Sequence, residues 1–258
     1  AASAATKQRC SLARRWSSRA ATSRPCCWTC ARWTAATSRG APTSGAARLA
    51  LVTGASRGLG AALAEGRAAQ GYHVLAVART VGALEELDDR IRAAGGQATL
   101  APMDVTEPEA MKQMTQAIAG RWGGLDLWAH CAVHAAPMSP APHIEGRDWS
   151  KSMLVNVEVT RGLIAMLEPL LRQRRGTALF FDDARGGQKF FGAYGASKAA
   201  QIALARSWQA ETVQTGPRIL IDTPAPMPTA VRARFHPGED RGALAPCRDE
   251  AARILSLL

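Results

Sequence analysis

Two short segments of the chain carry residue types that could do chemistry together. Residues 53–60 read TGASRGLG, and residues 194–198 read YGASK. In a helix, Tyr194 and Lys198 lie one turn apart, so their side chains share a face. A nearby ammonium favours the phenolate and lowers the phenol pKa, which suits proton transfer near neutral pH. An ordinary amphipathic helix would show the same pair, so its interpretation depends on the first segment.

The glycine-rich segment follows the apolar run 49–52, which is typical of a buried parallel strand. Its three glycines allow a tight turn, and residues 61–69 favour a helix. A strand, a glycine turn and a helix N-terminus form an anion site, because unpaired N–H groups and the helix dipole point at a phosphate. The spacing G-x-x-x-G-x-G differs from the G-x-G-x-x-G of other dinucleotide-binding folds, and a plain glycine-rich turn is the alternative.

The same residues also spell G-x-S-x-G, the pattern of a nucleophile elbow. A serine hydrolase using Ser56, a carboxylate and His236 is therefore a rival interpretation. The elbow would lie on the first predicted strand, however, and nothing fixes His236, which a proline follows. We keep the hydrolase as a remote alternative.

Together the two segments resemble the short-chain dehydrogenase/reductase family, and the resemblance covers residues 48–258. It implies an NAD(P)-dependent oxidoreductase, in which a hydride passes between the nicotinamide and a carbonyl or alcohol carbon. In that family Tyr194 would donate or accept the substrate proton. Lys198 would lower the Tyr pKa and hold the nicotinamide ribose, and Asn156 would order a water of the proton relay. A helical Asn without any such role is the alternative for Asn156.

The resemblance also implies contacts with the cofactor. Arg79 closes the second predicted strand at the position where a carboxylate would accept the ribose 2′-hydroxyl of NAD. An arginine there favours the 2′-phosphate of NADP because of its charge, and Arg57 adds a second cation. We therefore expect NADP(H), with NAD(H) as the alternative. Asp104 and Val105 match the adenine-contacting pair, although Asp104 could instead cap the next helix. The expected cofactor-binding residues are Gly54, Ser56, Arg57, Gly58, Leu59, Gly60, Arg79, Asp104, Val105, Ala132 and Thr229.

Two turns depart from the family pattern. After the fourth predicted strand the sequence reads HCAV over residues 130–133, without the glycine that the family has there. Val133 is therefore expected to crowd the cofactor ribose. The usual Pro-Gly after the sixth strand is Pro224-Ala225, and Ala resists a positive φ.

A third departure bears on catalysis, because the serine that polarises the substrate carbonyl is missing. No Ser or Thr lies between Ala178 and Tyr194. Phe181 stands at the strict spacing, and a one-residue deletion would align Asp182 or Asp183; Asp182 is our tentative assignment. An ionised carboxylate cannot donate a hydrogen bond to a developing alkoxide, and losing one such donor commonly costs ~10²–10³ in rate. An Asp could serve only if its surroundings kept it protonated.

Two hypotheses about function follow. The first is an NADP-dependent oxidoreductase with an altered carbonyl-polarising residue, and the second is a nucleotide-binding relative with little or no turnover. The substrate is expected to be a small carbonyl or alcohol. Arginines in and beside the flap 226–246 hint at an anionic substrate, although a solvated basic loop is the preferred interpretation. The residues expected to wall the pocket are Phe190, Phe191, Met138 and His134.

Charge divides the chain into two parts. Residues 1–48 hold nine Lys or Arg and no acid, which leaves 23 basic and 21 acidic residues in the remainder. A domain so close to neutral gives no support for a nucleic-acid partner. The leader 1–47 lacks acids like a transit peptide, but its clustered Trp and Cys favour an overextended gene start. Its Cys27-Trp28-Thr29-Cys30 string has no second ligand pair, so no metal site is expected.

Apolar strands alternate with helical segments over residues 48–258, which predicts one doubly wound Rossmann-type α/β domain with about six parallel strands. Right-handed crossovers would place the cofactor at the carboxyl ends of the strands. The expected strands are 49–52, 73–78, 98–103, 127–129, 177–181 and 218–221. The expected helices are 61–70, 80–94, 107–121, 147–173, 193–214 and 247–257. The family's seventh strand has no candidate, which puts the usual tetramer in doubt, while the long helices could form a homodimer.

Two further expectations concern location. No run approaches 18 apolar residues, so no membrane span is expected. Cys131 and Cys247 are typical of ordinary thiols in a reducing compartment, which favours a cytoplasmic protein.

Overall fold

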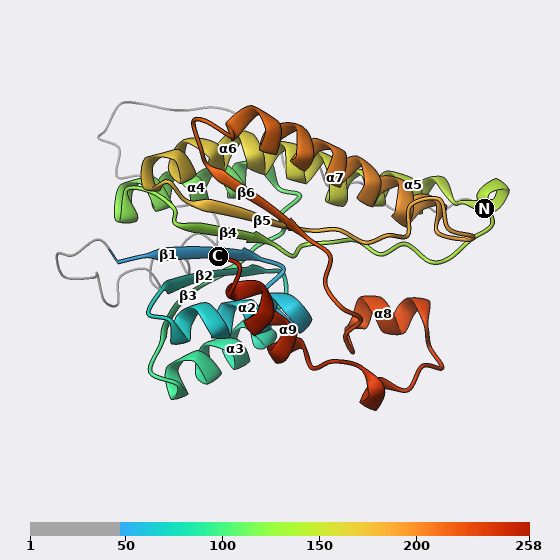
Figure 1. Ribbon diagram of the computed structural model, residues 1–258, viewed down its shortest axis with the longest axis horizontal. Helices are drawn as coiled ribbons and strands as arrows, with labels where there is room; N and C mark the ends of the chain where they lie inside the picture. The colour runs from blue at the N-terminus through green and yellow to red at the C-terminus, as the bar shows by residue number, and fades with distance from the viewer. Residues whose placement is uncertain (1–46) are drawn as a thin grey trace, which may run out of the picture.

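A six-stranded parallel sheet forms the middle layer of the protein in the computed structural model, which describes residues 47–258 (Figure 1). The predicted leader 1–47 lies outside the described residues except for its last position. The strand order is β3-β2-β1-β4-β5-β6, so the order reverses between β1 and β4. This confirms the predicted doubly wound arrangement. The strands are β1 (Leu49–Thr53), β2 (His73–Ala78), β3 (Gln97–Pro102), β4 (Leu127–His130), β5 (Thr177–Phe181) and β6 (Arg218–Asp222).

Helices cover both faces of the sheet, with α2, α3 and α9 on one side and α4, α6 and α7 on the other (Figure 1). The flap between β6 and α9 contains two short helices, α8 and η3, that the sequence did not predict. The helices are α2 (Gly58–Ala69), α3 (Val81–Ala93), α4 (Pro108–Trp122), η1 (Ala141–His143), α5 (Gly146–Met153), η2 (Leu154–Glu158), α6 (Val159–Arg174), α7 (Gly192–Thr212), α8 (Ala230–Phe235), η3 (Arg241–Ala243) and α9 (Cys247–Leu255).

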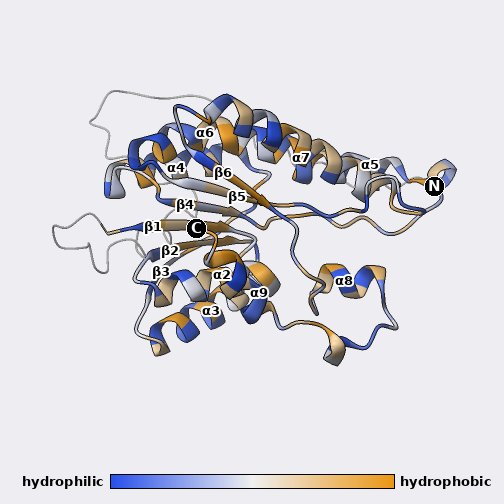
Figure 2. Cartoon of the chain, in the orientation of Figure 1, coloured by the Kyte–Doolittle hydropathy of each residue, from blue (hydrophilic) through white to orange (hydrophobic). Residues whose placement is uncertain are grey.

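Because both faces are covered, the central strands are buried and mostly apolar (Figure 2), while polar residues such as Gln97, Arg218 and Asp222 lie at the ends of the edge strands β3 and β6. Leu49 and Leu51 of β1 belong to the core under α4, α6 and α7. Ala50 and Val52 alternate with them and belong to the core under α2, α3 and α9. The period of two along one strand therefore supplies side chains to two separate hydrophobic layers.

An aromatic cluster fixes α7 over the middle of the sheet. Trp128 of β4 is fully buried and meets Phe180 of β5 edge to face, with 5.2 Å between ring centroids. Trp208 of α7 packs on both rings, at 6.4 Å from Trp128 and 6.3 Å from Phe180. Such contacts add to the free energy gained by burying the rings. They hold the helix that carries Tyr194 and Lys198 in one position relative to the strand ends.

The predicted helix 147–173 is a continuous rod with a wider turn inside it. Between α5 and α6, residues Leu154–Glu158 form the π-helical turn η2, in which Asn156 is completely buried. A π turn inserts one extra residue per turn and changes the direction of the side chains that follow it. The helical spacing of apolar residues in this segment did not predict the π turn.

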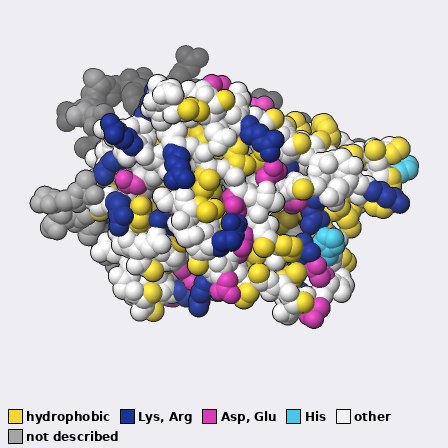
Figure 3. Space-filling model, in the orientation of Figure 1, with side chains coloured by type: hydrophobic (Ala, Val, Ile, Leu, Met, Phe, Trp, Pro, Cys, Tyr) yellow, Lys and Arg dark blue, Asp and Glu magenta, His cyan; other side chains and the backbone are white. Residues whose placement is uncertain are grey.

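Charged side chains of both signs are interspersed on the face shown in Figure 3. This mixture agrees with the near balance of 23 basic and 21 acidic residues that follow residue 48. None of the helices in residues 47–258 is long and apolar enough to cross a membrane.

The turn between β1 and α2 touches the chain that leaves β4. Gly54 has φ +77°, and a Cβ built on it would lie 2.7 Å from backbone atoms of Cys131 and Ala132. A Cβ on Gly60 would lie only 2.4 Å from the Gly54 carbonyl oxygen. Real side chains do not tolerate such contacts, so the turn can close only with glycine at both positions.

Gly54→Ala should therefore destabilise the protein more than Gly71→Ala, a control with a nearly identical φ of +79° and open space around it. The positive φ alone should cost each variant about 1 kcal/mol. The backbone clash should add about 1–3 kcal/mol at position 54. Urea unfolding followed by circular dichroism measures both losses, and equal losses would contradict the steric argument.

Candidate active site

A large cavity opens at the carboxyl ends of the strands, where the strand order reverses. Its volume is about 810 Å³, and its wall includes the β1–α2 turn, the segment after β4, the start of α7 and the flap. Open α/β sheets bind ligands at this position. All predicted cofactor-binding residues line this cavity, as do Tyr194, Lys198 and Asp182. Asn156 is the one predicted site residue that does not.

The glycine turn is shaped to receive the backbone of a ligand. Gly54 and Ala55 donate their N–H groups to the Val77 carbonyl, at 2.9 and 3.1 Å, which fixes the turn against β2. Helix α2 begins directly after the turn at Gly58, three residues earlier than predicted, and no side chain caps it. The first N–H groups of such a helix attract anions. The turn therefore fits a pyrophosphate group in both space and charge.

One cation and one carboxylate, Arg79 and Asp104, follow β2 and β3 and line the cavity. Arg79 is 71% exposed, and its guanidinium lies 3.7 Å from the Asp104 carboxylate. Asp104 does not cap the next helix, since α4 begins at Pro108 with Glu107 as its N-cap. Its Oδ1 instead accepts hydrogen bonds from the backbone N–H and the hydroxyl of Thr106, at 3.0 and 2.9 Å.

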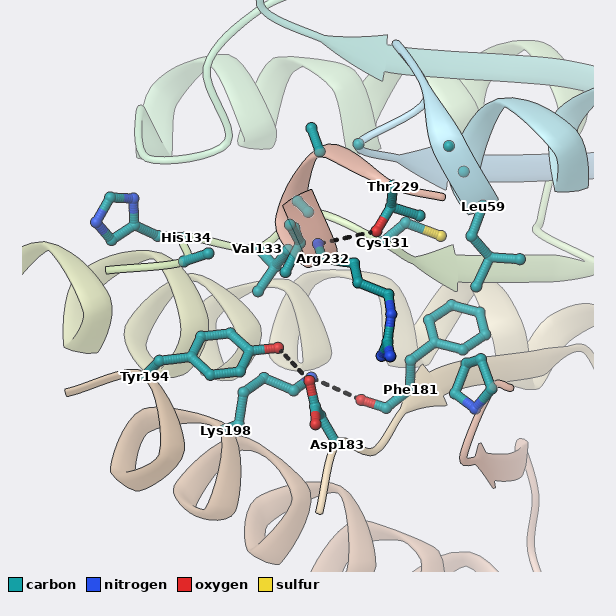
Figure 4. Close-up of a pocket in the computed structure, with 18 of the residues that line it drawn as sticks. Leu59, Cys131, Val133, His134, Phe181, Asp183, Tyr194, Lys198, Thr229 and Arg232 are labelled. Atoms are coloured by element: carbon teal, nitrogen blue, oxygen red, sulfur yellow. Dashed lines mark hydrogen bonds between the residues drawn. The ribbon is translucent and has the colours of Figure 1, made fainter. Parts of the chain in front are cut away.

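The flap reaches across the glycine turn through Thr229. The Thr229 hydroxyl caps α8 by accepting a hydrogen bond from the Arg232 N–H at 3.2 Å (Figure 4). Its methyl group lies 3.4 Å from where a Cβ on Gly58 would sit. Cys131 also lies beside the glycine turn, 3.2 Å from where a Cβ on Gly60 would sit. Burial raises the pKa of its thiol to about 12, so this thiol stays protonated and is no nucleophile.

Tyr194 and Lys198 face the cavity from one side of α7, and their side chains are almost completely buried (Figure 4). The Tyr194 hydroxyl donates a hydrogen bond of 2.9 Å to Oδ2 of Asp183. Burial and then this carboxylate raise the Tyr194 pKa. The expected lowering of the phenol pKa by Lys198 is therefore wrong for this structure, because a buried phenol beside a carboxylate keeps its proton.

The Lys198 ammonium is held by two acceptors, both from residues that line the cavity. It donates to the Phe181 carbonyl at 2.6 Å and to Oε1 of Gln201 at 2.5 Å. Burial lowers the pKa of Lys198 to about 8, and the charges of Asp183 and Asp182 oppose this effect. Lys198 is thus close to losing its proton under mildly alkaline conditions.

The two aspartates after β5 have different surroundings. Asp182 accepts the backbone N–H of Asp183 and lies 3.3 Å from the Arg206 guanidinium. Asp183 is the residue that contacts Tyr194, and Arg185 pairs with it at 3.0 Å. We assigned Asp182, from the sequence, to the position of the missing serine. The carboxylate that contacts Tyr194 is instead that of Asp183. Spacing alone could not distinguish the two, because their side chains leave the chain in different directions.

Asn156 lies beneath the cavity wall and is fully satisfied by the protein. Its Oδ1 accepts the His134 N–H at 2.8 Å, and its Nδ2 donates to the His134 carbonyl and to the Ser197 hydroxyl, both at 2.9 Å. The π turn places Asn156 for these contacts. They tie α7 to the segment after β4, and the expected role in ordering a water stays a prediction.

The predicted flap arginines mostly hold the flap itself. Arg232 forms two hydrogen bonds of 2.5 Å with Glu239, and Arg234 donates to the Ala135 carbonyl. Arg241 donates to the Pro228 carbonyl. These contacts give the basic residues structural partners, so they add nothing to the hint of an anionic substrate.

Three of the four predicted wall residues, Phe190, Phe191 and Met138, do not line the cavity. Phe190 and Met138 are 42% and 43% exposed, and Phe190 adopts a positive φ of 71° that turns the chain outward. Phe191 is buried in a cluster with Tyr194 and Phe235. His134 does line the cavity, as predicted.

The hydrolase alternative finds no support in this geometry. Nε2 of His236 lies 3.1 Å from the Arg185 guanidinium. Within residues 47–258, Ser56 forms no side-chain hydrogen bond to a base, so the pair that a serine nucleophile requires is missing. The same part of the chain contains no cluster of three or more side chains suited to a metal ion.

Comparison with known proteins agrees with the site. The sequence profile of the family described as short chain dehydrogenase matches residues 48–240. A fatty acyl-CoA reductase from Acinetobacter baylyi is 32% identical over 194 residues, which cover 71% of this chain and 66% of the reductase. An uncharacterized oxidoreductase of Mycobacterium tuberculosis H37Rv is 33% identical over 201 residues, covering 73% of this chain and 59% of that protein. The chain thus spans no more than about two thirds of these curated relatives.

A solved structure gives the same picture. A candidate short chain dehydrogenase from Shigella flexneri 2a, complexed with NADP, matches with a TM-score of 0.73 at 30% identity, over 78% of this chain and 87% of that chain. The family profile covers every strand from β1 to β6 and the residues that line the cavity from Gly54 to His236. The chain therefore belongs to the short-chain dehydrogenase/reductase family of oxidoreductases.

Proposed function

We propose that this protein is an NADP(H)-dependent oxidoreductase that acts on a small carbonyl or alcohol substrate, with Tyr194 as the proton donor and acceptor. The observation that carries the proposal is the position of Tyr194 and Lys198, both buried and both lining the cavity that the glycine turn also lines. A nucleotide cradle and an acid–base pair in one cavity are what hydride transfer requires of a protein.

The nicotinamide would supply the hydride, and the protein would handle the proton. In the direction of reduction, the carbonyl oxygen gains a proton as its carbon gains the hydride. Tyr194 is placed to supply that proton, because its side chain lines the cavity and a phenol carries its proton at neutral pH. Besides burial, the carboxylate of Asp183 raises the Tyr194 pKa and so makes the phenol a weaker acid while that contact persists. Lys198 would hold the cofactor ribose with the N–H that Phe181 and Gln201 leave unused.

Charge supports NADP(H) over NAD(H). Arg79 stands where β2 ends, and most of its side chain is exposed toward the cavity mouth. Arg57 is exposed in the glycine turn and lines the same cavity. A 2′-phosphate would gain two cationic partners there, whereas a 2′-hydroxyl would gain none of that charge complementarity. The relative from Shigella flexneri was solved with NADP, which agrees with this choice.

One observation favours the second candidate, a nucleotide-binding relative with little turnover. The Asp183 carboxylate accepts the hydrogen bond from Tyr194 that a substrate carbonyl would need. An ionised carboxylate also cannot replace the missing serine as a donor to the developing alkoxide. A substrate must therefore displace Asp183 from the Tyr194 hydroxyl before it can receive the proton.

A screen of small diketones, quinones and aldehydes with NADPH tests the main proposal. Wild-type protein should oxidise NADPH with at least one of them, and Tyr194→Phe should lower that rate by at least about 10²-fold, because the general acid is lost. Tyr72→Phe is the matched control, since its ring lies against Arg48 and Arg67, away from the cavity. No turnover with any carbonyl, or full turnover in Tyr194→Phe, would overturn the proposal.

Asp183→Ser should raise kcat/KM for the best substrate, by up to about 10²-fold, because it frees Tyr194 and restores a hydroxyl donor. Asp182→Ser discriminates between the two carboxylates: its side chain faces Arg206, so no such gain is expected. Steady-state kinetics measures both variants. A loss of activity in Asp183→Ser as large as in Tyr194→Phe would show that the carboxylate takes part in the reaction.

Arg79→Ala should weaken NADPH binding about 10–100-fold and leave NADH binding nearly unchanged, since only the 2′-phosphate pairs with this guanidinium. Arg92→Ala is a suitable control, because Arg92 is similarly exposed but pairs with Asp88 on α3. Fluorescence titration of both cofactors measures the effect. Equal weakening for NADPH and NADH would assign Arg79 to the adenosine ribose or to structure instead.

A further inference from the structure

A chain of buried polar side chains runs from Lys198 into the protein interior. It consists of Gln201 on α7, Thr160 on α6, His130 at the end of β4 and Thr53 at the end of β1, none more than 4% exposed. Four different elements thus contribute one polar group each to a part of the core that is otherwise apolar. In the reaction proposed above, Gln201 enters only as an acceptor of Lys198, and the other three residues have no part.

Each link in this chain is a short hydrogen bond. Gln201 accepts from the Lys198 ammonium through Oε1 at 2.5 Å and donates through Nε2 to the Thr160 hydroxyl at 2.8 Å. His130 bridges Thr160 and Thr53, with its Nε2 at 3.0 Å from one hydroxyl and its Nδ1 at 2.8 Å from the other. Buried polar groups connected in this way hold one another in a single arrangement.

Counting protons orients every bond in the chain. The single hydrogen of the Thr160 hydroxyl goes to the Asn156 carbonyl at 2.8 Å. Thr160 must therefore accept from both Gln201 and His130, which places the His130 proton on Nε2 and leaves Nδ1 to accept from Thr53. Burial and the charge of Lys198 lower the His130 pKa to about 3, which agrees with one ring proton only.

The chain ends in the core and therefore cannot carry protons to solvent. Thr53 is completely buried, and its hydroxyl also lies 3.4 Å from the Ala129 carbonyl. What the chain does determine is the orientation of the Gln201 amide: with Nε2 committed to Thr160, Oε1 must point at Lys198. Without the bond to Thr160, the Gln201 amide could rotate, and the Lys198 ammonium would then lose one of its two protein acceptors.

Few of the groups around Lys198 stabilise its charged form, so the hydrogen bond to Gln201 matters for that charge. Asp182 and Asp183 face it from the loop after β5, Cys131 and His130 from the end of β4, and Tyr194 from one turn earlier on α7. Cys131, His130 and Tyr194 stay neutral, as their shifted pKa values require. Only the two carboxylates and the two hydrogen-bond acceptors therefore oppose the desolvation of the ammonium.

We propose that Gln201, oriented by Thr160 and His130, is a positioning residue that fixes the Lys198 ammonium at the cavity wall and keeps it charged. This inference rests on the proposed role of Lys198 in holding the cofactor. With Phe181 and Gln201 occupying two of its three N–H groups, Lys198 presents a single donor to the cavity.

Two substitutions at one position test the proposal by the sign of their effects. Gln201→Leu removes an acceptor of the ammonium and should lower the Lys198 pKa by about one unit. Gln201→Glu places a carboxylate there and should raise the Lys198 pKa by about one unit or more. Thr160→Val leaves Gln201 unoriented and should lower the pKa less than Gln201→Leu does. Gln209→Leu is the control, since Gln209 on the same helix bonds the Ile219 carbonyl.

NMR titration of the full chain labelled at lysine Cε measures these pKa values directly, and the sequence has only five lysines to assign. Shifts of opposite sign in the two Gln201 variants, with none in Gln209→Leu, would support the proposal; shifts of the same sign, or none, would overturn it. The titration needs no turnover. A wild-type protein that fails to oxidise NADPH therefore refutes the proposed function and leaves this test intact.

With active enzyme, the alkaline limb of kcat/KM for NADPH should move in step with the Lys198 pKa. It should move to lower pH in Gln201→Leu, where the ammonium is lost earlier, and to higher pH in Gln201→Glu. If Gln201 had only a structural role, both variants would change the stability of the protein, and the alkaline limb of kcat/KM would stay at the same pH in both. Identical alkaline limbs in both variants would contradict the positioning role even if both lost stability.

Discussion

The backbone of the β1–α2 turn touches the backbone that leaves β4, and no side chain fits between them at position 54. This contact joins the two strands at which the sheet reverses its order, so it determines where the cavity opens. Helix α2 starts directly after the turn and aims its first N–H groups at the same space. The flap then closes over the turn through Thr229. The cofactor side of the site therefore follows from one close approach of two backbones.

A carboxylate is the hydrogen-bond partner of the Tyr194 hydroxyl in the cavity. Asp183 joins the Tyr194 phenol to the Arg185 guanidinium, which in turn contacts His236 of the flap. Burial and Asp183 together keep the phenol protonated, while burial brings the Lys198 pKa to about 8. Both members of the pair are thus pushed toward their neutral forms. This electrostatic state differs from a phenolate stabilised by an ammonium, because the neutral phenol donates its proton in a hydrogen bond to the carboxylate.

The interior beneath the pair is more polar than a sheet–helix interface requires. His130 lies beside the rings of Trp128 and Phe180, and it is linked by hydrogen bonds through Thr160 to Gln201 within the core. In such surroundings an unpaired polar group would cost about 1–3 kcal/mol, whereas a satisfied network restrains its members to one geometry. The aromatic rings position α7 as a whole, and the polar chain positions one side chain on it.

The sequence by itself determined the fold class, the family, the approximate positions of the strands and the residues of the glycine turn and the Tyr194–Lys198 pair. These features depend on local spacing and on apolar periodicity, which are properties of the chain read in order. Only the tertiary structure decided that Asp183 meets Tyr194, that the phenol pKa rises, and that Gln201 and His130 connect to Lys198. Such contacts depend on side-chain directions and burial where distant segments meet, and no pattern within a single segment contains that information.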